Sequence, residues 1–329
     1  MPAHPALATT SIGSPIGSST SRVRKWTLIA GAVLLVVLAG AVLAVEVLLP
    51  RMFVVPSRTH YNPAAPADTP LKEDLQFTAF DTTTRDGLTL KCWFVPAAPQ
   101  PAAGTVLILH GWGGSKEWVR ELIELVVRNG WNAVAYDSRA HGGSGGRYMS
   151  YGVREKDDVT AVLNQVEAQF KNAGPFGILG ISYGGAVATQ ALGQEPRLRC
   201  GVILSSFCRL EDVARAQMRL MTGGCNDWVF HRVLAKGESL AGFRVGDVQP
   251  TEAARKITQP VLVIHGAHDN LCPVADARQL FEHIASKDKE WFAAEHADHF
   301  GILESSDRPE IDRRIVAFFG REMPPAAGR

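Results

Sequence analysis

The residues with the clearest capacity for chemistry surround Ser182. The segment Gly180-Ile181-Ser182-Tyr183-Gly184 directly follows an apolar run, Phe176–Leu179, and precedes a run of small residues. A serine between a strand and a helix, with glycines on both sides, sits on the tight turn that exposes a nucleophilic hydroxyl. The helix that follows also favours the negative charge that develops there. The pattern therefore predicts Ser182 as a nucleophile.

A serine hydroxyl needs a base, and the base needs an acid that orients it. In strand–turn–helix sites of this kind the chain order is serine, acid, histidine. Asp269 lies just past the apolar run Val261–Ile264, and His299 follows the run Trp291–Ala294 after a short loop. These positions predict Asp269 as the acid and His299 as the base.

Neighbouring residues offer alternatives. His296 could be the base, but it follows its strand too closely. Asp298 could be the acid, but its adjacency to His299 makes a side-on hydrogen bond awkward. His268, next to Asp269, is expected to have a hydrogen-bonding role rather than a catalytic one.

The tetrahedral intermediate of acyl transfer needs two backbone donors for its oxyanion. The amide of Tyr183, directly after the nucleophile, is the first candidate. The second is the amide of Trp112, in the loop His110-Gly111-Trp112-Gly113-Gly114-Ser115 that follows the apolar run Thr105–Leu109. The Trp112 indole could line an acyl pocket or pack under the loop.

Strands alternating with helices must position these residues. Runs 77–83 and 88–95 flank the turn Arg85-Asp86-Gly87 and predict a hairpin. Short apolar runs of the buried parallel type follow at 105–109, 133–136, 176–179, 202–204, 261–264 and 291–294. Amphipathic stretches between them include 117–128, 155–170 and 274–284. The order predicts an α/β fold with a mostly parallel, doubly wound sheet.

The chain resembles the α/β-hydrolase superfamily, in its serine-hydrolase subset, from about residue 77 to residue 319. The resemblance rests on five motifs in order: HGWGGS (110–115), DSRAHGGSGG (137–146), GISYGG (180–185), PVLVIHGAHD (260–269) and the terminal ADHFGIL. It implies that Asp137, Arg139 and His141 are mainly structural. Ala140 stands where glycine is usual. The stretch Tyr151-Gly152-x-x-Glu155 resembles bacterial acyl hydrolases related to monoacylglycerol lipases and serine aminopeptidases.

The N-terminal region has a different composition. Residues 1–25 contain no acidic residue and are expected to be a disordered tail, and residues 26–49 are expected to form one transmembrane helix, since Trp26–Val45 is uncharged over 20 residues. A cleaved signal peptide is the alternative. Basic residues before Trp26 favour a cytoplasmic N-terminus with the catalytic domain outside.

Beyond the predicted membrane helix, five prolines suggest a linker over residues 50–72. The hydrolase domain is expected to occupy residues 73–329. Residues 208–259 are too many for one connecting helix and predict a small helical cap. Met218, Leu220, Met221, Trp228 and Phe230 could form an acyl-binding surface in this cap or could pack it onto the domain.

Composition excludes several functions. A net charge of +1 favours neither nucleic acid nor a strongly acidic partner. The spacing His296-x-x-His299 falls in a loop without an HExxH pattern, so no metal site is expected, and no phosphate-binding or dinucleotide motif implies a cofactor. The five cysteines show no paired spacing, which favours buried thiols, although disulfides remain open.

Three functional hypotheses follow. The first is an esterase or lipase-like serine hydrolase that takes a small-molecule or lipid ester through an acyl-enzyme. The second is a serine peptidase of the aminopeptidase type, and the third is a non-catalytic binding protein with a hydrolase fold. The sequence indicates no oligomeric state.

Overall fold

The computed structural model describes residues 19–58, 75–98 and 100–324, and the chain divides into two compact units, residues 1–48 and residues 49–329. The first unit contains α1 (Ser19–Leu43) and the π-helix η1 (Ala44–Leu48). Helix therefore begins before Trp26, which corrects the predicted disordered tail for residues 19–25. This stretch contains no Pro or Gly, so the apolar helix extends through it. Residues 1–18 lie outside the described part.

The N-terminal helix is long and apolar enough to cross a membrane. The candidate span runs from Arg22 to Val54, with a mean hydropathy of 2.9 in its most apolar window. A secretory signal sequence passes the same test of length and composition.

The predicted linker is wrong at its start. Residues 49–54 form α2 (Leu49–Val54), and Pro50, Phe53 and Val54 are buried within the second unit. Apolar residues of this segment are thus packed within the second unit, where a spacer was expected. The rest of the predicted linker, residues 59–72, lies outside the described residues.

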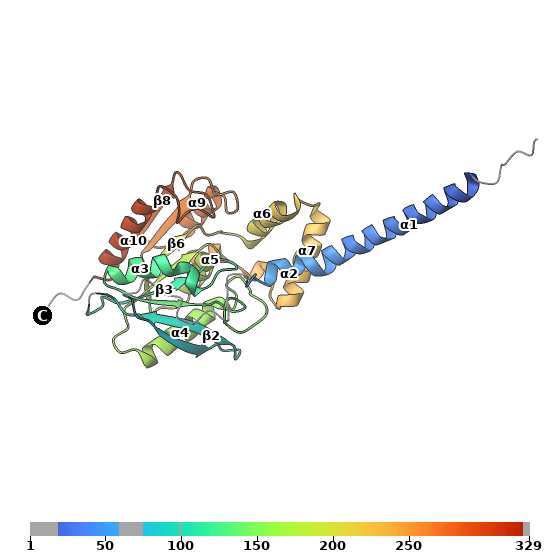
Figure 1. Ribbon diagram of the computed structural model, residues 1–329. Helices are drawn as coiled ribbons and strands as arrows, with labels where there is room; N and C mark the ends of the chain where they lie inside the picture. The colour runs from blue at the N-terminus through green and yellow to red at the C-terminus, as the bar shows by residue number, and fades with distance from the viewer. Residues whose placement is uncertain (1–18, 59–74, 99, 325–329) are drawn as a thin grey trace, which may run out of the picture. The chain divides into compact units, whose positions relative to one another are not determined.

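The second unit is built on one central sheet (Figure 1). It has eight strands in the order β1-β2-β4-β3-β5-β6-β7-β8. The predicted hairpin is confirmed as an antiparallel β1–β2 pair, β2 is also antiparallel to β4, and every later pairing is parallel. The strands are β1 (Thr78–Thr83), β2 (Thr89–Val95), β3 (Thr105–Leu109), β4 (Asn132–Tyr136), β5 (Phe176–Ile181), β6 (Leu198–Leu204), β7 (Val261–Gly266) and β8 (Lys289–Ala294).

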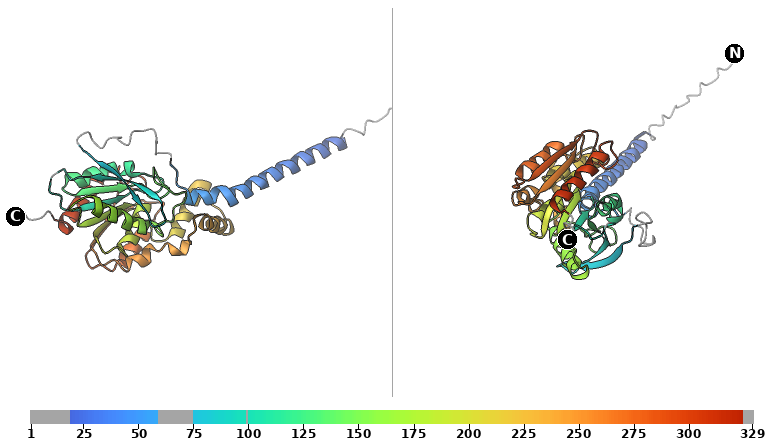
Figure 2. Two further views of the ribbon diagram at one scale, coloured as in Figure 1. Left: turned by 90° about the horizontal axis from the view of Figure 1, so that it is seen from below. Right: turned by 90° about the vertical axis from the view of Figure 1, so that its left-hand side faces the viewer.

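Helices cover both faces of the sheet, as the two views of Figure 2 show. Helices α3 and α10 pack on one face, and α4, α5, α8 and α9 lie on the other. Their bounds, with those of the 3-10 helices, are η2 (Lys116–Val119), α3 (Arg120–Arg128), α4 (Glu155–Gln169), α5 (Tyr183–Leu192), α6 (Leu210–Thr222), α7 (Asp227–Ala241), η3 (Val245–Asp247), α8 (Pro250–Ala254), α9 (Val274–His283) and α10 (Arg308–Glu322).

The sheet is the core of the molecule. Strands β3, β4 and β5 are buried at every residue, as expected for parallel strands covered on both faces. The main cluster joins these strands to the apolar sides of α3 and α10, through residues such as Ile123, Val127, Ile315 and Phe319. The α/β-hydrolase fold predicted from the sequence is confirmed, and α6, α7, η3 and α8 form the insertion between β6 and β7.

Candidate active site

Ser182 lies between β5 and α5 with φ 54° and ψ −117°, a conformation that few non-glycine residues adopt. The flanking glycines make this turn possible. A β-carbon on Gly184 would lie 2.6 Å from the carbonyl oxygen of His110, and one on Gly180 would lie 2.8 Å from the amide nitrogen of Gly185. The backbone at the turn therefore approaches both the start of α5 and the end of β3 at distances that only glycine permits.

The predicted base and acid are brought to this serine from two other strand ends. The Ser182 Oγ lies 2.9 Å from His299 Nε2, and His299 Nδ1 lies 2.7 Å from Asp269 Oδ2. The Asp269 and His299 side chains are almost completely buried. With a proton on Nδ1 donated to Asp269, Nε2 is free to accept the proton of Ser182.

Asp269 is held as a carboxylate. Burial would raise its pKa, but hydrogen bonds from His265 and His299 outweigh burial and lower the pKa to about 2. The amides of Leu271 and Cys272 donate to the other oxygen at 3.0 and 2.7 Å. The acid is thus ionised throughout the neutral range and its orientation is defined by four donors.

His265 is a contributor that the sequence analysis missed. This fully buried residue places Nε2 3.2 Å from Asp269 Oδ2 and 2.7 Å from the Cys272 carbonyl oxygen. The available signal was its position near the end of β7, four residues before the acid. His268, for which a hydrogen-bonding role was expected, has an exposed side chain with no hydrogen bond among the described residues.

The alternative base and acid have other hydrogen-bond partners in the structure. His296 pairs with Asp307, with 3.1 Å between Nδ1 and Oδ1, and its side chain is exposed. Asp298 accepts a hydrogen bond from the amide of Gly301 at 2.7 Å. His296 and Asp298 thus have their hydrogen-bond partners within the loop between β8 and α10.

The loop after β3 passes beside the nucleophile. A β-carbon on Gly111 would lie 3.6 Å from Ser182 Cβ. The His110 ring fixes the loop because Nδ1 lies 2.7 Å from the Gly111 carbonyl oxygen while Nε2 accepts the amide of Ser138 at 3.1 Å. Among the described residues, the amides of Trp112 and Tyr183 donate to no backbone carbonyl, so both remain available to an oxyanion.

Residues 137–146 form a loop beside the site that is held by hydrogen bonds and ion pairs, in the structural role that the resemblance implied. Asp137 accepts hydrogen bonds from the amides of Lys116 and Gly143 and pairs with the Lys116 ammonium at 2.9 Å. Arg139 pairs with Asp158 and Asp86.

Ala140, which stands where glycine is usual, has φ 64° in the left-handed region. An alanine in this region is strained, because its β-carbon disfavours the left-handed conformation that glycine adopts freely.

Beside Ser182 lies a cavity of about 280 Å³ whose lining is mostly apolar. Leu220 and Met221 of α6 line this cavity, as expected for an acyl-binding surface. Met218 and Phe230 are instead buried by helix packing, which was the alternative, and Trp228 is exposed. The complete lining is Gly111, Trp112, Trp118, Tyr151, Ile181, Ser182, Tyr183, Phe207, Val213, Gln217, Leu220, Met221, Leu271, His299 and Phe300.

One group near the site could offer ligands to a metal. Ligand atoms of Asp269, Cys272 and His299 lie within 4.8 Å of one another. Burial raises the pKa of the Cys272 thiol well above its ordinary value, whereas a metal binds the thiolate. Both nitrogens of His299 already have partners, so the arrangement suits proton transfer better than metal binding. All five cysteines are free thiols, and only Cys225 is exposed.

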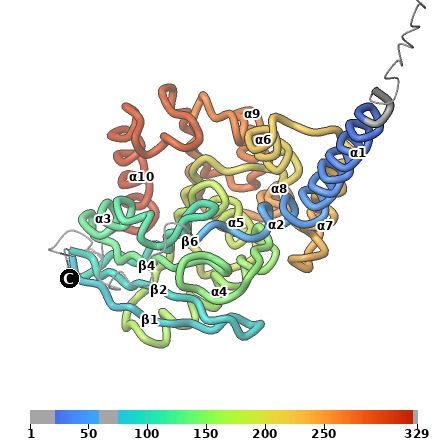
Figure 3. The backbone as a smooth tube through the Cα atoms, turned by 45° about the vertical axis from the view of Figure 1, so that its right-hand side comes forward, coloured from blue at the N-terminus to red at the C-terminus, as the bar shows by residue number. Residues whose placement is uncertain are grey.

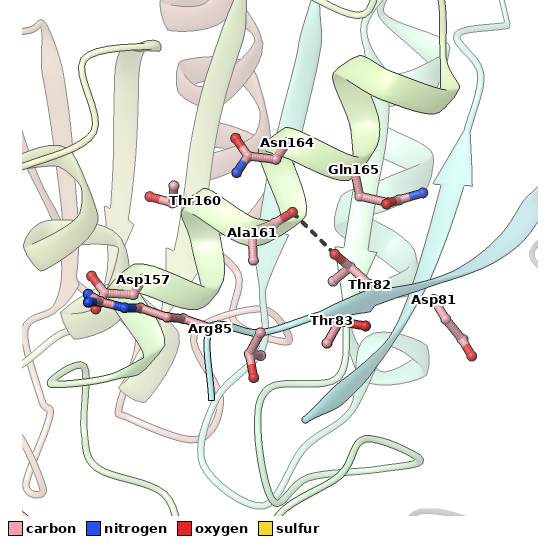
Figure 4. Close-up of a pocket in the computed structure, with 10 residues that line it drawn as sticks. Asp81, Thr82, Thr83, Arg85, Asp157, Thr160, Ala161, Asn164 and Gln165 are labelled. Carbon is pink, nitrogen blue, oxygen red and sulfur yellow. Dashed lines mark hydrogen bonds between the residues drawn. The ribbon is translucent and has the colours of Figure 1, made fainter. Parts of the chain in front are cut away.

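A second, polar hollow of about 610 Å³ lies between β1 and α4 (Figure 4). Thr82 in its wall donates a hydrogen bond to the Ala161 carbonyl oxygen at 3.2 Å. The hollow shares no lining residue with the cavity at Ser182, so it is separate from the candidate active site.

Known proteins resemble this chain in both sequence and structure. The family model Hydrolase_4, described as serine aminopeptidase, S33, matches residues 100–248 and 246–306. The uncharacterised protein YqkD of Bacillus subtilis is 30% identical over 233 residues, which are 69% of this chain and 74% of YqkD.

Two solved structures extend the comparison. The Pyrococcus furiosus esterase Pf2001 has a TM-score of 0.68 at 25% identity, covering 82% of this chain and 98% of the esterase. The acylaminoacyl peptidase of Pyrococcus horikoshii has a TM-score of 0.58 at 17% identity, covering 78% of this chain and 43% of the peptidase, which is a likeness of fold alone.

Proposed function

The chain belongs to the α/β-hydrolase family described as serine aminopeptidase, S33, and from this premise we propose that it is a serine hydrolase that cleaves carboxylic esters with apolar acyl groups. The observation that carries the proposal is the continuous hydrogen-bonded relay from Ser182 through His299 to Asp269, at 2.9 and 2.7 Å, beside an apolar cavity.

The relay supports a two-step mechanism. Ser182 Oγ attacks the ester carbonyl while its proton passes to His299 Nε2, and the amides of Trp112 and Tyr183 stabilise the oxyanion. Collapse of the intermediate expels the alcohol, which takes the proton from Nε2 and leaves an acyl-serine. His299 Nε2 then removes a proton from water, whose oxygen attacks the acyl carbon. Collapse of this second intermediate breaks the bond to Ser182 Oγ, which takes the proton back from Nε2, and releases the acid.

The lining of the cavity favours an ester over an aminopeptidase substrate. An aminopeptidase must hold a protonated amino terminus, and an ammonium buried without an anionic partner is costly. Among the described residues, none that lines the cavity is Asp, Glu, Lys or Arg. An uncharged acyl group fits this lining, whereas a free amino terminus lacks a counter-ion.

The mouth of the cavity supports an amphiphilic ester. Trp118, Leu220 and Phe300 line the cavity and are 56%, 61% and 71% exposed. Exposed apolar side chains grouped at one place are typical of surfaces that meet apolar ligands or lipid. We therefore place lipid-like esters within the proposed substrate class.

The proposal includes anchoring by the N-terminal helix, with the N-terminus in the cytoplasm and the catalytic domain outside. Arg22, Arg24 and Lys25 before the apolar run support this orientation. The N-terminal sequence of the mature protein tests the anchor: an intact apolar helix supports it, and a new N-terminus beyond the start of the apolar run indicates a cleaved signal sequence.

The deciding experiment is Ser182→Ala in the full chain. We expect no hydrolysis of p-nitrophenyl acyl esters and no labelling by a fluorophosphonate probe, because the attacking oxygen is gone. The matched control is Ser205→Ala, which removes another buried hydroxyl at the end of the adjacent strand and should retain both.

Labelling that persists in Ser182→Ala would refute the assignment of the nucleophile. Faster turnover of aminoacyl amides than of esters by the unaltered protein would favour the peptidase, and no labelling of the unaltered protein would favour a binding protein.

A further inference from the structure

Residues 49–58, here called the α2 segment, directly follow the first unit and lie within the second. Four of these residues are buried: Pro50, Phe53, Val54 and Pro56. The segment is remote in sequence from Ser182, yet it contacts three parts of the active-site surroundings.

The first contact is with the wall of the acyl cavity. Tyr151, which lines the cavity, donates its hydroxyl to the Phe53 carbonyl oxygen at 2.6 Å, and the amide of Met149 donates to the Val54 carbonyl oxygen at 3.0 Å. Tyr151 has φ 53°, a strained backbone conformation that persists only where its surroundings hold it. The α2 segment thus fixes a cavity residue at both its ring and its neighbouring backbone.

The second contact is with the loops beside the nucleophile. Arg58 donates from Nε to the Ala140 carbonyl oxygen at 3.0 Å and from Nη2 to those of Ser144 and Gly146 at 3.1 and 3.0 Å. This loop also carries Ser138, whose amide binds the His110 ring that positions Gly111. The Ser57 carbonyl oxygen lies at the loop after β3, because a β-carbon on Gly113 would be 3.7 Å from it.

The third contact is with the cap. Helix α2 packs against α7, and the two lie side by side in Figure 3. The close approach is at Gly237 of α7, where a β-carbon would lie 3.5 Å from Val54 Cγ1 and 3.6 Å from the Pro50 carbonyl oxygen. The C-terminal end of α7 is joined to the Tyr151 region by Arg154, which donates to the carbonyl oxygens of Ala241 and Gly242, both at 2.9 Å.

We propose that the α2 segment is a positioning element of the acyl cavity: it sets Tyr151 and the cap relative to Ser182 and thereby controls how long acyl chains bind. This inference rests on the proposed ester hydrolysis. None of the hydrogen bonds described above joins the segment to Ser182, His299 or Asp269, so its displacement should change substrate binding more than the chemistry of the triad. The first residues of the second unit are, in consequence, part of the substrate-binding structure.

A matched pair of substitutions at Gly237 tests the proposal in the full chain. Gly237→Ala fits, because its added methyl would make ordinary contacts of 3.5 and 3.6 Å, and it should behave like the unaltered protein. Gly237→Leu places a larger side chain against Val54 and should displace the α2 segment. We expect Gly237→Leu to raise KM for an octanoyl ester about tenfold, as a loss of about 1.4 kcal/mol of binding implies, with little change in kcat or in the rate of fluorophosphonate labelling.

Arg58 supplies a second test at the other end of the segment. Arg58→Ala should raise KM for the octanoyl ester more than for an acetyl ester, and Arg58→Lys, which retains one charged donor, should restore part of the difference. The control is Arg51→Ala, since the exposed Arg51 side chain has no partner among the described residues. A parallel fall in kcat, in fluorophosphonate labelling and in melting temperature would indicate a merely structural role and overturn the proposal. A KM for the octanoyl ester that is unchanged in both Gly237→Leu and Arg58→Ala would overturn it as well.

Hydrogen exchange separates this proposal from the proposed function. Faster exchange of residues 140–151 and of α7 in Gly237→Leu, but not in Gly237→Ala, is expected whatever the substrate is. If the unaltered protein hydrolyses no ester, the proposed function fails on its own; if exchange in these regions is the same in both variants, the positioning role fails.

Discussion

At the scale of single residues, the arrangement around Asp269 decides how well His299 can act as a base. The carboxylate accepts hydrogen bonds from two imidazoles and two backbone amides, and these outweigh the cost of burying its charge. His299 is the imidazole that faces Ser182, whereas His265 lies deeper and has no contact with the nucleophile. His265 is therefore a positioning residue for the acid.

Replacing His265 tests this role. His265→Phe keeps a ring of similar size but removes the donor, so we expect kcat/KM to fall about tenfold, the effect of losing roughly 1.5 kcal/mol from a hydrogen bond to a charged group. The loss should appear in kcat more than in KM, because His265 does not line the substrate cavity. His268→Phe, an exposed neighbour, is the control. Equal losses in both variants would contradict the assignment.

At the scale of elements, the site is assembled from loops at one edge of the sheet. Trp112 follows β3, Ser182 follows β5, Asp269 follows β7 and His299 follows β8. Parallel strands place their carboxyl ends at the same edge, so residues far apart in sequence converge there. The β5–α5 turn is the most constrained of these loops, since its glycines lie against the loop after β3.

The elbow should not tolerate a methyl group. Gly184→Ala places a β-carbon 2.6 Å from the His110 carbonyl oxygen, so either α5 or the loop with Trp112 must shift. We expect at least about 1–3 kcal/mol of destabilisation and near-complete loss of esterase activity, measured by urea unfolding and by turnover of a soluble ester. In the control Gly246→Ala, the β-carbon meets no atom within 4 Å, and stability and activity should be retained. An active, stable Gly184→Ala protein would contradict the described packing of the elbow.

At the scale of the whole molecule, the stability of the fold should depend on pH, because two histidine side chains near the site are buried. His110 and His141 are fully buried with ring centroids 4.9 Å apart. Burial lowers the pKa of both, and it lowers the pKa of His141 well below its usual value. Both rings are thus neutral in the folded protein but ionise in the unfolded chain.

This difference predicts a loss of stability in mild acid. Because the folded pKa values lie below the unfolded value of about 6.5, the unfolded chain binds more protons as pH falls below that value. The free energy of unfolding should decline by up to about 1.4 kcal/mol per pH unit for each histidine. The depressed pKa of Asp269 acts only at lower pH, since its contribution is lost from about 3.8 downward.

Urea unfolding between pH 7.5 and 5.5 measures this decline. His141→Gln, which retains a side-chain N–H that can donate to the Arg139 carbonyl oxygen, should show a shallower slope than the unaltered protein. An equal slope in the two proteins would remove His141 as a cause.

The sequence alone determined the order of strands and helices, the glycine-flanked turn at Ser182, and the succession of Ser182, Asp269 and His299 as candidates. These features depend on local sterics and on short-range periodicity, both of which are determined by residues within a few positions along the chain. Only the tertiary structure decided that His265, not His268, contacts Asp269, and that Leu220 and Met221 face the cavity while Met218 packs inside. It also decided that Pro50, Phe53, Val54 and Pro56 are buried in a segment that contacts α7 and the Tyr151 region. The burial of the α2 segment depends on contacts between residues about a hundred or more positions apart, and a local pattern of prolines does not encode which distant surface each side chain meets. The choice of His265 over His268 depends on the path of the loop after β7, which places one imidazole against Asp269 and leaves the other exposed.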